Sequence, residues 1–446
     1  MRTLLAEAYS NKFYMLVVII VVFFTIGIVF HFEWFLTLLI MCIIITLLFV
    51  NRSLLWGLII FGLALLSSIN MQFDTFFHFN TTIILLFILV IKYSNELLIV
   101  NIKPNKNILL FLAIYVFLIY TLSYSSDQEF GMMKLKKFIL STPFFIITFL
   151  VFKNQFKSIS TIFRSAFIIG LCYLFFVITY PDYSYFPRLT TLHINPIWFS
   201  RFLGMIFIIG VFFIRWSKKI HFKLSYFTAI LFMLFFMIRT GSRGPILSLA
   251  VSLLFVYIID LFKQKRFNLK LFLMILSTIM IIAIMLYIAS SFLPEDIKER
   301  LLSKGRDVQN SSLVRVLLAV DAINLFKSNL ILGVGLGGFT KGVLGNFKYP
   351  HNIFLELLSE MGIIGTIFFS SIFIYASFKF SRIIKKYGVY SKGYEVGMLL
   401  LTIFIFTFIN AQFSGSIDGN MYLWFSIGGV IFYSTWDGDI LNENLS

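Results

Sequence analysis

The chain alternates long apolar runs with short polar connections. A helix that spans a bilayer needs about 20 mostly apolar residues, with a range of about 17–25. Runs of this kind lie near residues 14–30, 35–50, 54–69, 76–91, 108–124, 138–152, 165–180, 198–214, 224–238, 246–262, 271–292, 362–379, 397–413 and 420–435. They are too long and continuous for barrel strands, and an open sheet cannot satisfy its backbone in lipid. The pattern predicts an all-α polytopic membrane protein with about 12–14 transmembrane helices.

One polar interval, from about residue 293 to 361, is much longer than the others. Residues 294–302 predict a short surface helix, and the apolar spacing of 312–327 predicts an amphipathic helix lying on the membrane or on the bundle. The glycines of 333–338 resemble a phosphate-binding loop only weakly, because the Gly-Lys-Ser/Thr ending of such a loop is missing. They predict a flexible turn or hinge instead. We expect one integral membrane domain over 1–446, with 293–361 as a long outer loop that carries the active site.

Composition supports the membrane prediction. The 446 residues are 59% hydrophobic and only 13% charged, against about a quarter charged in a soluble protein. Both cysteines, Cys42 and Cys172, lie far apart in apolar runs, so we expect no disulfide and no metal site from them. The first apolar run has no small-residue cleavage site after it and predicts a retained helix rather than a signal peptide.

Basic residues indicate the orientation. With the N-terminus in the cytoplasm, 22 of the 37 Lys and Arg residues fall on the cytoplasmic side. The positive-inside rule then predicts cytoplasmic N- and C-termini and an active site that faces the periplasm or the outside. The net charge of +17 is explained by this asymmetry and by contact with membrane lipids, so it predicts no nucleic-acid partner.

The end of the long interval holds the candidate base, His351. Pro350 can open a helix and Asn352 is a candidate N-cap, which would place His351 beside the positive end of a helix dipole. A histidine held neutral in this way can accept a proton. The alternative is a helix-end histidine satisfied by the backbone.

Five arginines stand out on the predicted outer side: Arg188, Arg201, Arg239, Arg243 and Arg315. The guanidinium fork suits phosphate oxygens, so several arginines in one pocket would hold a pyrophosphate without a metal. Each could instead reach lipid headgroups or pair with a nearby acid. Arg239 and Arg243 lie within five residues of each other, on a turn with Gly and Pro. This clustering favours a functional role for the two.

Two acids follow the candidate base. Glu356 and Glu360 are four residues apart and share a helix face. We expect a solvated face for both, with orientation of a substrate hydroxyl as the alternative for each. The spacing of His, Cys and carboxylates predicts no zinc site, and Ser242 lacks the frame of a nucleophile elbow.

The pattern His351-Asn352, nine residues, Gly362, two residues, Gly365 resembles a motif of bacterial O-antigen ligases and of the related O-antigen polymerases. Arg243-Gly-Pro-Ile-Leu247 resembles the Arg-x3-Leu pattern of the same family. The resemblance covers roughly residues 180–380. The family usually has twelve spans.

The resemblance implies a glycosyltransferase that uses an undecaprenyl-pyrophosphate-linked glycan donor at the outer face of the bacterial cytoplasmic membrane. It implies His351 as the base and Arg243 as a pyrophosphate ligand. To these we add Arg315, Arg188 and Arg239 for the pyrophosphate, and Asn352 and Glu356 for positioning the glycan acceptor. No metal and no cofactor are expected, and attack opposite the phosphate would invert the anomeric centre. A chain-length regulator protein is a further candidate partner.

Three alternatives remain open. We favour a polymerase of O-antigen or similar surface polysaccharide units, and an O-antigen ligase that acts on lipid A-core is the second reading. A flippase for lipid-linked oligosaccharide is more remote, because flippases tend to carry charge within their helices and these spans have little. A structural scaffold would give no reason for the His351 loop.

Overall fold

The computed structural model describes residues 52–66, 106–179, 181–182, 188–191, 194–264, 295–301, 306–342, 347–389 and 391–436. Within these ranges the chain forms the helices α3 (Arg52–Leu66), α5 (Lys106–Ser123), α6 (Gln128–Val151), α7 (Phe156–Thr179), α8 (Pro196–Trp216), α9 (Ile220–Arg239), α10 (Arg243–Gln264), α12 (Glu295–Leu301), α13 (Arg306–Ser328), the 3₁₀ helix η1 (Gly338–Lys341), α14 (Ile353–Lys386), α15 (Lys392–Ala411) and α16 (Met421–Tyr433). The two-residue strands β1 (Pro181–Asp182) and β2 (Thr190–Thr191) pair antiparallel. The predicted all-α class is confirmed.

Seven of the described helices are long and apolar enough to cross a membrane: α5, α7, α8, α9, α10, α14 and α15. Each coincides with a predicted apolar run. Four predicted spans, 14–30, 35–50, 76–91 and 271–292, lie outside the described residues. The total of 12–14 spans therefore stays a prediction, whereas a multi-pass membrane protein is confirmed.

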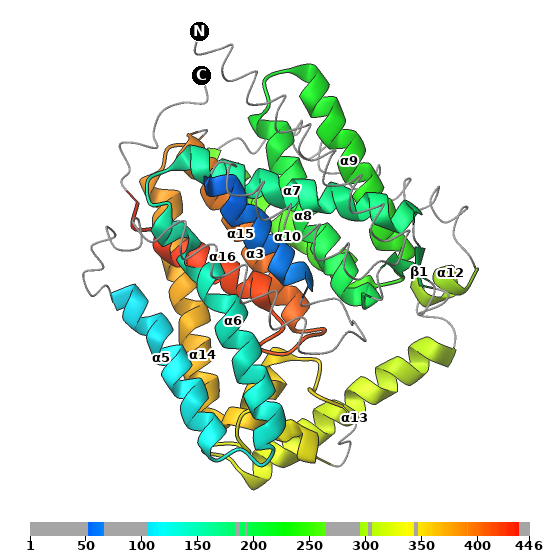
Figure 1. Ribbon diagram of the computed structural model, residues 1–446, viewed down its shortest axis with the longest axis vertical. Helices are drawn as coiled ribbons and strands as arrows, with labels where there is room; N and C mark the ends of the chain where they lie inside the picture. The colour runs from blue at the N-terminus through cyan, green and yellow to red at the C-terminus, as the bar shows by residue number, and fades with distance from the viewer. Residues whose placement is uncertain are drawn as a thin grey trace, which may run out of the picture.

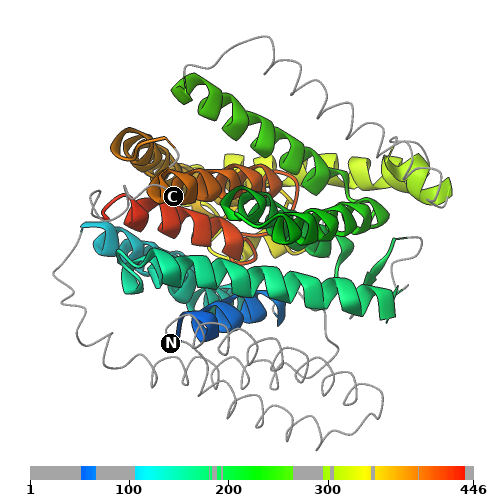
Figure 2. The same ribbon diagram turned by 90° about the horizontal axis from the view of Figure 1, so that it is seen from above.

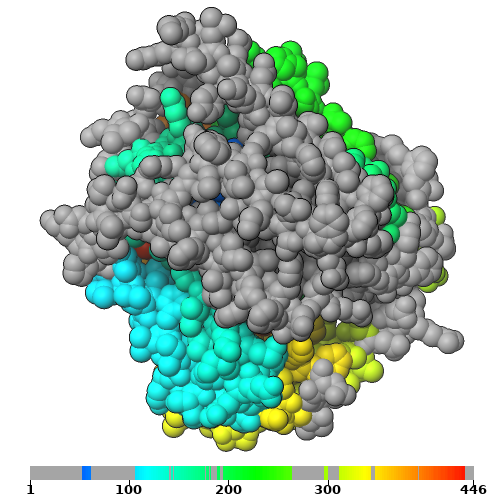
Figure 3. Space-filling model, in the orientation of Figure 1, coloured from blue at the N-terminus to red at the C-terminus, as the bar shows by residue number. Residues whose placement is uncertain are grey.

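The core of the bundle lies around α15 and α16, which the other helices surround (Figure 1, Figure 2). Outer helices such as α5 and α9 expose apolar side chains. In the apolar segment of α15, 83% of the residues are buried inside the protein, whereas in those of α5 and α9 the share is 28%. Figure 3 shows α5 on the surface at the lower end of the molecule. This difference is typical of a helical membrane protein, in which the outermost helices face lipid and not water.

Five connections that the sequence places outside meet at one end of the bundle. Ser126 N–H donates to the Val334 carbonyl, which joins the α5–α6 connection to the long loop. Arg188 donates to the Thr240 carbonyl, which joins the α7–α8 and α9–α10 connections. The connection between α15 and α16, residues 412–420, is the fifth. At the opposite end Arg215 pairs with Glu395 at 2.7 Å.

Helix α14 is broken at Gly362, where φ is 61° and ψ is −160°. A break leaves carbonyl and N–H groups without helical partners, which is costly at membrane depth. The segment 330–335 satisfies them: Val334 and Gly335 N–H donate to the Ser359 and Glu360 carbonyls, and Ile363 and Ile364 N–H donate to the Leu330 and Ile331 carbonyls. The loop and the span are therefore one folded unit, and the predicted loop boundary at 361 lies next to the break in the helix.

The glycines of 333–338 form a tightly packed turn. Gly335 and Gly337 have φ values of +85° and +81°. A Cβ on Gly335 would lie 2.2 Å from the Cα of Ser125, and one on Gly337 would lie 2.5 Å from the backbone nitrogen of Gly131. The expected flexible hinge is wrong, because positive φ and close backbone contact require these glycines.

Candidate functional site

The start of α14 is capped as predicted. The Asn352 side-chain oxygen accepts hydrogen bonds from the N–H groups of Phe354, at 2.9 Å, and Leu355, at 3.1 Å. Asn352 is therefore the N-cap and stabilises the helix at its first turn. The helix begins at Ile353, so the expectation that Pro350 opens it is wrong.

His351 immediately precedes this cap, with a φ of 60° that non-glycine residues rarely adopt. Its ring lies edge-on to that of Tyr349, with centroids 4.7 Å apart. The pKa of His351 is lowered to about 4, first by burial and then by the positive charge of Arg315. The imidazole is therefore neutral near pH 7, as expected, with burial and the charge of Arg315 as the causes. Its Nδ1 is buried without a hydrogen-bond partner among the described residues.

Three of the four predicted arginines gather at the α9–α10 turn. Arg188 donates from Nε to the Thr240 carbonyl at 2.8 Å and from Nη2 to the Ser242 hydroxyl at 2.7 Å. Arg239 ends α9, and its Nη1 is buried with no hydrogen-bond partner in the part of the chain that the structure describes. Arg243 is the first residue of α10. The fourth arginine, at position 315, lies on α13 and interacts electrostatically with the candidate base.

Residues 412–420 connect the arginine turn with the start of α14. The Asn352 side-chain nitrogen donates to the Gln412 carbonyl at 3.2 Å. A Cβ on Gly244, one residue into α10, would lie 3.4 Å from the Phe413 side chain, an ordinary packing contact. The start of α14 and the arginine turn therefore contact the same short connection.

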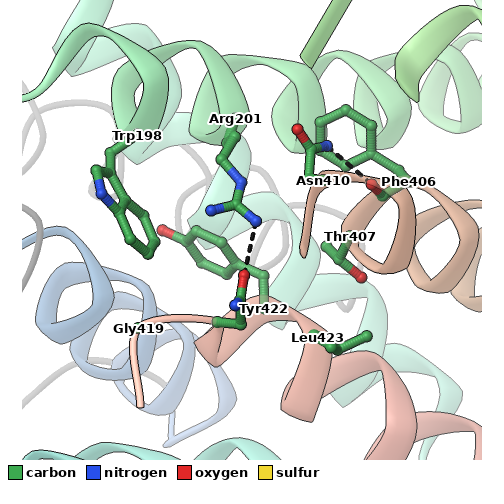
Figure 4. Close-up of a pocket in the computed structure, with 9 residues that line it drawn as sticks. Trp198, Arg201, Phe406, Thr407, Asn410, Gly419, Tyr422 and Leu423 are labelled. Atoms are coloured by element: carbon green, nitrogen blue, oxygen red, sulfur yellow. Dashed lines mark hydrogen bonds between the residues drawn. The ribbon is translucent and has the colours of Figure 1, made fainter. Parts of the chain in front are cut away.

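Sequence analysis listed Arg201 among the outward arginines but did not assign it to the site. Arg201 is only 5% exposed, and its Nη2 donates to the Asn420 side-chain oxygen at 2.6 Å (Figure 4). Its guanidinium lies over the Trp198 ring at 4.8 Å, and its Nη1 has no hydrogen-bond partner among the described residues. A small pocket surrounds it, lined by Trp198, Arg201, Phe406, Thr407, Asn410, Gly419, Asn420, Tyr422 and Leu423. An arginine at the start of an apolar run was the signal, since such a charge is expensive in lipid.

Tyr349 is a buried neighbour of His351. Burial raises the pKa of Tyr349, and the positive charge of Arg201 opposes that rise. The Tyr349 side chain also hydrogen-bonds Ser414, and its ring contacts that of His351. Tyr349 is therefore in ring contact with His351 and within electrostatic reach of the Arg201 guanidinium.

Beneath the site lies a group of buried charges, Lys134, Glu356 and Glu360, which we call the buried ion cluster. Lys134 Nζ lies 2.5 Å from Glu356 Oε1 and 2.8 Å from Glu360 Oε2, and all three side chains are at most 3% exposed. The expected solvated face for the two acids is therefore wrong, because a lysine from α6 covers it. The other Glu356 oxygen accepts the Ile417 N–H at 3.0 Å, so this carboxylate braces residues 412–420.

A second lysine of α6 reaches the same connection. Lys137 lies 3.4 Å from Asp418, whose side chain is 7% exposed. Burial raises the pKa of Asp418, but Lys137 and Lys134 together lower it below its ordinary value. Within the described ranges no group of three or more His, Cys, Asp or Glu residues is arranged to hold a metal ion.

Residues 228–370 match the family described as O-antigen ligase. The chain contains a domain of the O-antigen ligase family. The matched region runs from α9 to α14 and holds His351, Asn352, Glu356 and the arginines at 239, 243 and 315. It excludes Arg188, Arg201 and the 412–420 connection. A comparison with curated proteins gave no match. The family includes lipid-linked glycan polymerases and O-antigen ligases, so the chain works in polysaccharide biosynthesis.

The four residues that resemble the O-antigen ligase motif each meet a structural demand here. His351 adopts a left-handed backbone, and Asn352 caps the helix. A Cβ on Gly362 would lie 2.4 Å from the Ile331 carbonyl oxygen, and one on Gly365 would lie 2.2 Å from the Met361 side chain. The spacing of the motif therefore positions the imidazole at the end of a broken helix.

Proposed function

We propose that this protein is a polysaccharide polymerase that transfers a glycan from undecaprenyl pyrophosphate to a hydroxyl of a second lipid-linked repeat unit. Enzymes of the O-antigen ligase family transfer glycans from donors of this kind. The observation that carries the proposal is His351, whose imidazole is neutral at pH 7 and whose buried Nδ1 has no hydrogen-bond partner among the described residues, so it is free to accept a proton. The family match favours an enzyme that transfers glycans over a flippase that transports lipid-linked glycans across the membrane.

In the proposed reaction His351 accepts the proton of the acceptor hydroxyl while the hydroxyl oxygen attacks the anomeric carbon of the donor. The bond between that carbon and the pyrophosphate oxygen breaks, and undecaprenyl pyrophosphate leaves with the electron pair. Attack from the side opposite the leaving group inverts the anomeric centre. The linkage itself supplies the energy, so the proposal includes no cofactor and no metal ion.

Arginines would stabilise the charge that develops on the leaving pyrophosphate. Arg201 and Arg239 each bury an Nη1 without a hydrogen-bond partner among the described residues, so each has a donor available for a phosphate oxygen. We assign Arg243 and Arg315 to the same anionic group. Arg188 would act by holding the α9–α10 turn, since its fork donates to Thr240 and Ser242.

Asn352 and Glu356 would position the acceptor indirectly. Both hold residues 412–420, Asn352 through the Gln412 carbonyl and Glu356 through the Ile417 N–H. We place the site on the outer face of the bacterial inner membrane, with both termini in the cytoplasm, because the basic residues favour that orientation. A chain-length regulator is proposed as a protein partner.

A ligase that gives the glycan to lipid A-core is the second candidate, because the matched family is described as O-antigen ligase. The two functions differ only in the acceptor, and the surface glycan of a deletion strain separates them. A single repeat unit on the core is expected for a missing polymerase. A bare core with long chains left on the carrier lipid would indicate a ligase. Absence of lipid-linked glycan outside the cell would instead indicate a flippase and contradict both.

A further inference from the structure

Helix α13 has one apolar face that packs on the protein. Leu318 and Ala322 are 0% and 1% exposed and form a small cluster with Phe339, and Leu355 of α14 packs against it. Figure 1 shows α13 crossing the lower end of the bundle, where α5, α6 and α14 also end or begin. The packing explains why α13 stays attached beside the site.

A second apolar face of α13 points away from the protein. It consists of Leu313, Val316, Leu317, Val320 and Ile323, which we call the outer stripe; their side chains are 58%, 59%, 45%, 49% and 40% exposed. The spacing of three and four residues puts them on one side of the helix. A helix bathed in water would carry polar residues there, and a contiguous exposed apolar patch marks an interaction surface.

The outer stripe is continuous with the lipid-facing side of a span. Directly after α13 the chain exposes Leu330 and Ile331, at 53% and 63%. Their carbonyls accept the N–H groups of Ile363 and Ile364, which are 43% and 45% exposed on α14. Ile367, further along this membrane-spanning helix, is 63% exposed. The outer stripe is therefore continuous with the lipid-facing surface of α14, and the two are joined by these backbone hydrogen bonds.

We infer that α13 lies in the plane of the membrane surface, with the outer stripe inserted at the boundary between lipid headgroups and acyl chains. The partner is the bilayer itself. Arg315, Asp321 and Lys327 make the helix too polar to cross the membrane, whereas a polar helix with one apolar stripe is typical of an interfacial helix. Lys327 lies at the end of the stripe, where a long side chain can reach the headgroups.

This placement has a consequence for the site, which rests on the proposed function. Arg315 lies on α13, and its charge acts on His351. An interfacial α13 holds both groups at the depth of the headgroups, where the pyrophosphate of a lipid-linked donor also lies. The donor then reaches the base by diffusing in the leaflet and does not have to leave the membrane.

Spin labelling of the full-length protein in liposomes tests the inference. Cys42 and Cys172 are replaced by alanine, and one cysteine at a time carries the nitroxide: Leu313→Cys, Val316→Cys, Leu317→Cys or Val320→Cys on the stripe, and Ser312→Cys or Ala319→Cys beside it as matched controls. Collision rates are measured with oxygen, which concentrates in lipid, and with a water-soluble nickel chelate. We expect the oxygen-to-nickel ratio to be several-fold higher on the stripe than at the controls.

Two results would overturn the inference. A nickel rate that exceeds the oxygen rate at all six positions would place the stripe in water. Low rates with both reagents on the stripe would show that protein covers it, such as a second copy of the chain. The readout does not depend on catalysis, so normal glycan from His351→Ala cells would refute the proposed function without affecting this result.

Discussion

The buried ion cluster and the Arg201 pocket lie at the same end of the bundle and differ in how their polar atoms are satisfied. In the cluster, Lys134 meets Glu356 at 2.5 Å and Glu360 at 2.8 Å, and the second Glu356 oxygen takes a backbone N–H. In the pocket, Arg201 is bound on one side by Asn420, while its Nη1 has no hydrogen-bond partner among the described residues.

This difference in hydrogen bonding indicates that the buried ion cluster stabilises the fold, whereas the Arg201 pocket is suited to binding. Buried polar groups in native proteins are nearly always paired, because an unpaired one costs about 1–3 kcal/mol. A fully paired set such as the buried ion cluster therefore fixes the fold. Among the described residues, the Nη1 of Arg201 beside its pocket and the Nδ1 of His351 have no hydrogen-bond partner, and each is retained at a cost that substrate binding would remove.

The largest effect on activity is expected for His351→Ala. Loss of a general base lowers the rate by about 10²–10⁴-fold. The rate is measured with purified protein in liposomes and a lipid-linked glycan donor, and the unfolding temperature is measured on the same sample. His221→Ala is the matched control, because His221 is exposed at the opposite end of the bundle. Full activity of His351→Ala would remove this residue from the reaction.

Lys134→Met is expected to act on stability. Removing one partner of a buried ion pair costs about 3–5 kcal/mol, because the carboxylates of Glu356 and Glu360 stay buried without compensation. Lys136→Met is the matched control, since Lys136 is exposed on the same helix. Thermal unfolding in detergent compares the two variants. An equal unfolding temperature for both would show that the cluster does not stabilise the fold.

Arg201→Lys is expected to lower the rate about tenfold or more while the unfolding temperature changes little. A lysine keeps the charge but replaces a fork with a point charge, so it cannot hold Asn420 and a phosphate oxygen together. Arg164→Lys, on an exposed part of α7, is the control. If Arg201→Lys lost stability and kept its rate, the pocket would belong with the buried ion cluster.

The sequence predicted the features of the site that depend on neighbouring residues, but not the contacts between residues that are distant in the chain. Local patterns placed the Asn352 cap, the helix at 312–327 and the described spans, because capping and apolar periodicity act within a few residues. The partnership of Lys134 with Glu356 could not be predicted, because it joins residues 222 positions apart. A solvated face was expected for Glu356 and Glu360 for the same reason. The sequence of α14 alone does not indicate that α6 covers these two side chains.

The glycines show the same limit. Their type and spacing indicated a turn at 333–338, but the tight packing depends on two residues distant in sequence, Ser125 in the α5–α6 connection and Gly131 in α6. Arg201 was visible as an arginine in an apolar run, yet its half-satisfied state depends on Asn420, which lies 219 positions further along the chain.

The pH profile should reveal the surroundings of His351. In the proposed reaction the neutral imidazole is the active form, and its pKa of about 4 lies below the ordinary 6.5. The rate is therefore expected to hold as pH falls from 7 to 5 and to drop only as pH approaches 4. Arg315→Gln removes the positive neighbour, so the drop should move to higher pH. A half-maximal rate near pH 6.5 in the unmodified protein would show that neither burial nor Arg315 acts on the base.

The smallest expected effect is that of a chelator. If arginines around the Arg201 pocket hold the leaving pyrophosphate, its charge is balanced by side chains that EDTA does not touch. The rate in liposomes should be the same with and without EDTA, at a fixed ionic strength so that screening stays constant. A rate that fell in EDTA and returned with a divalent ion would assign part of that charge balance to a metal. The unpartnered Nη1 atoms of Arg201 and Arg239 would then need a different explanation from the one that separates the pocket from the buried ion cluster.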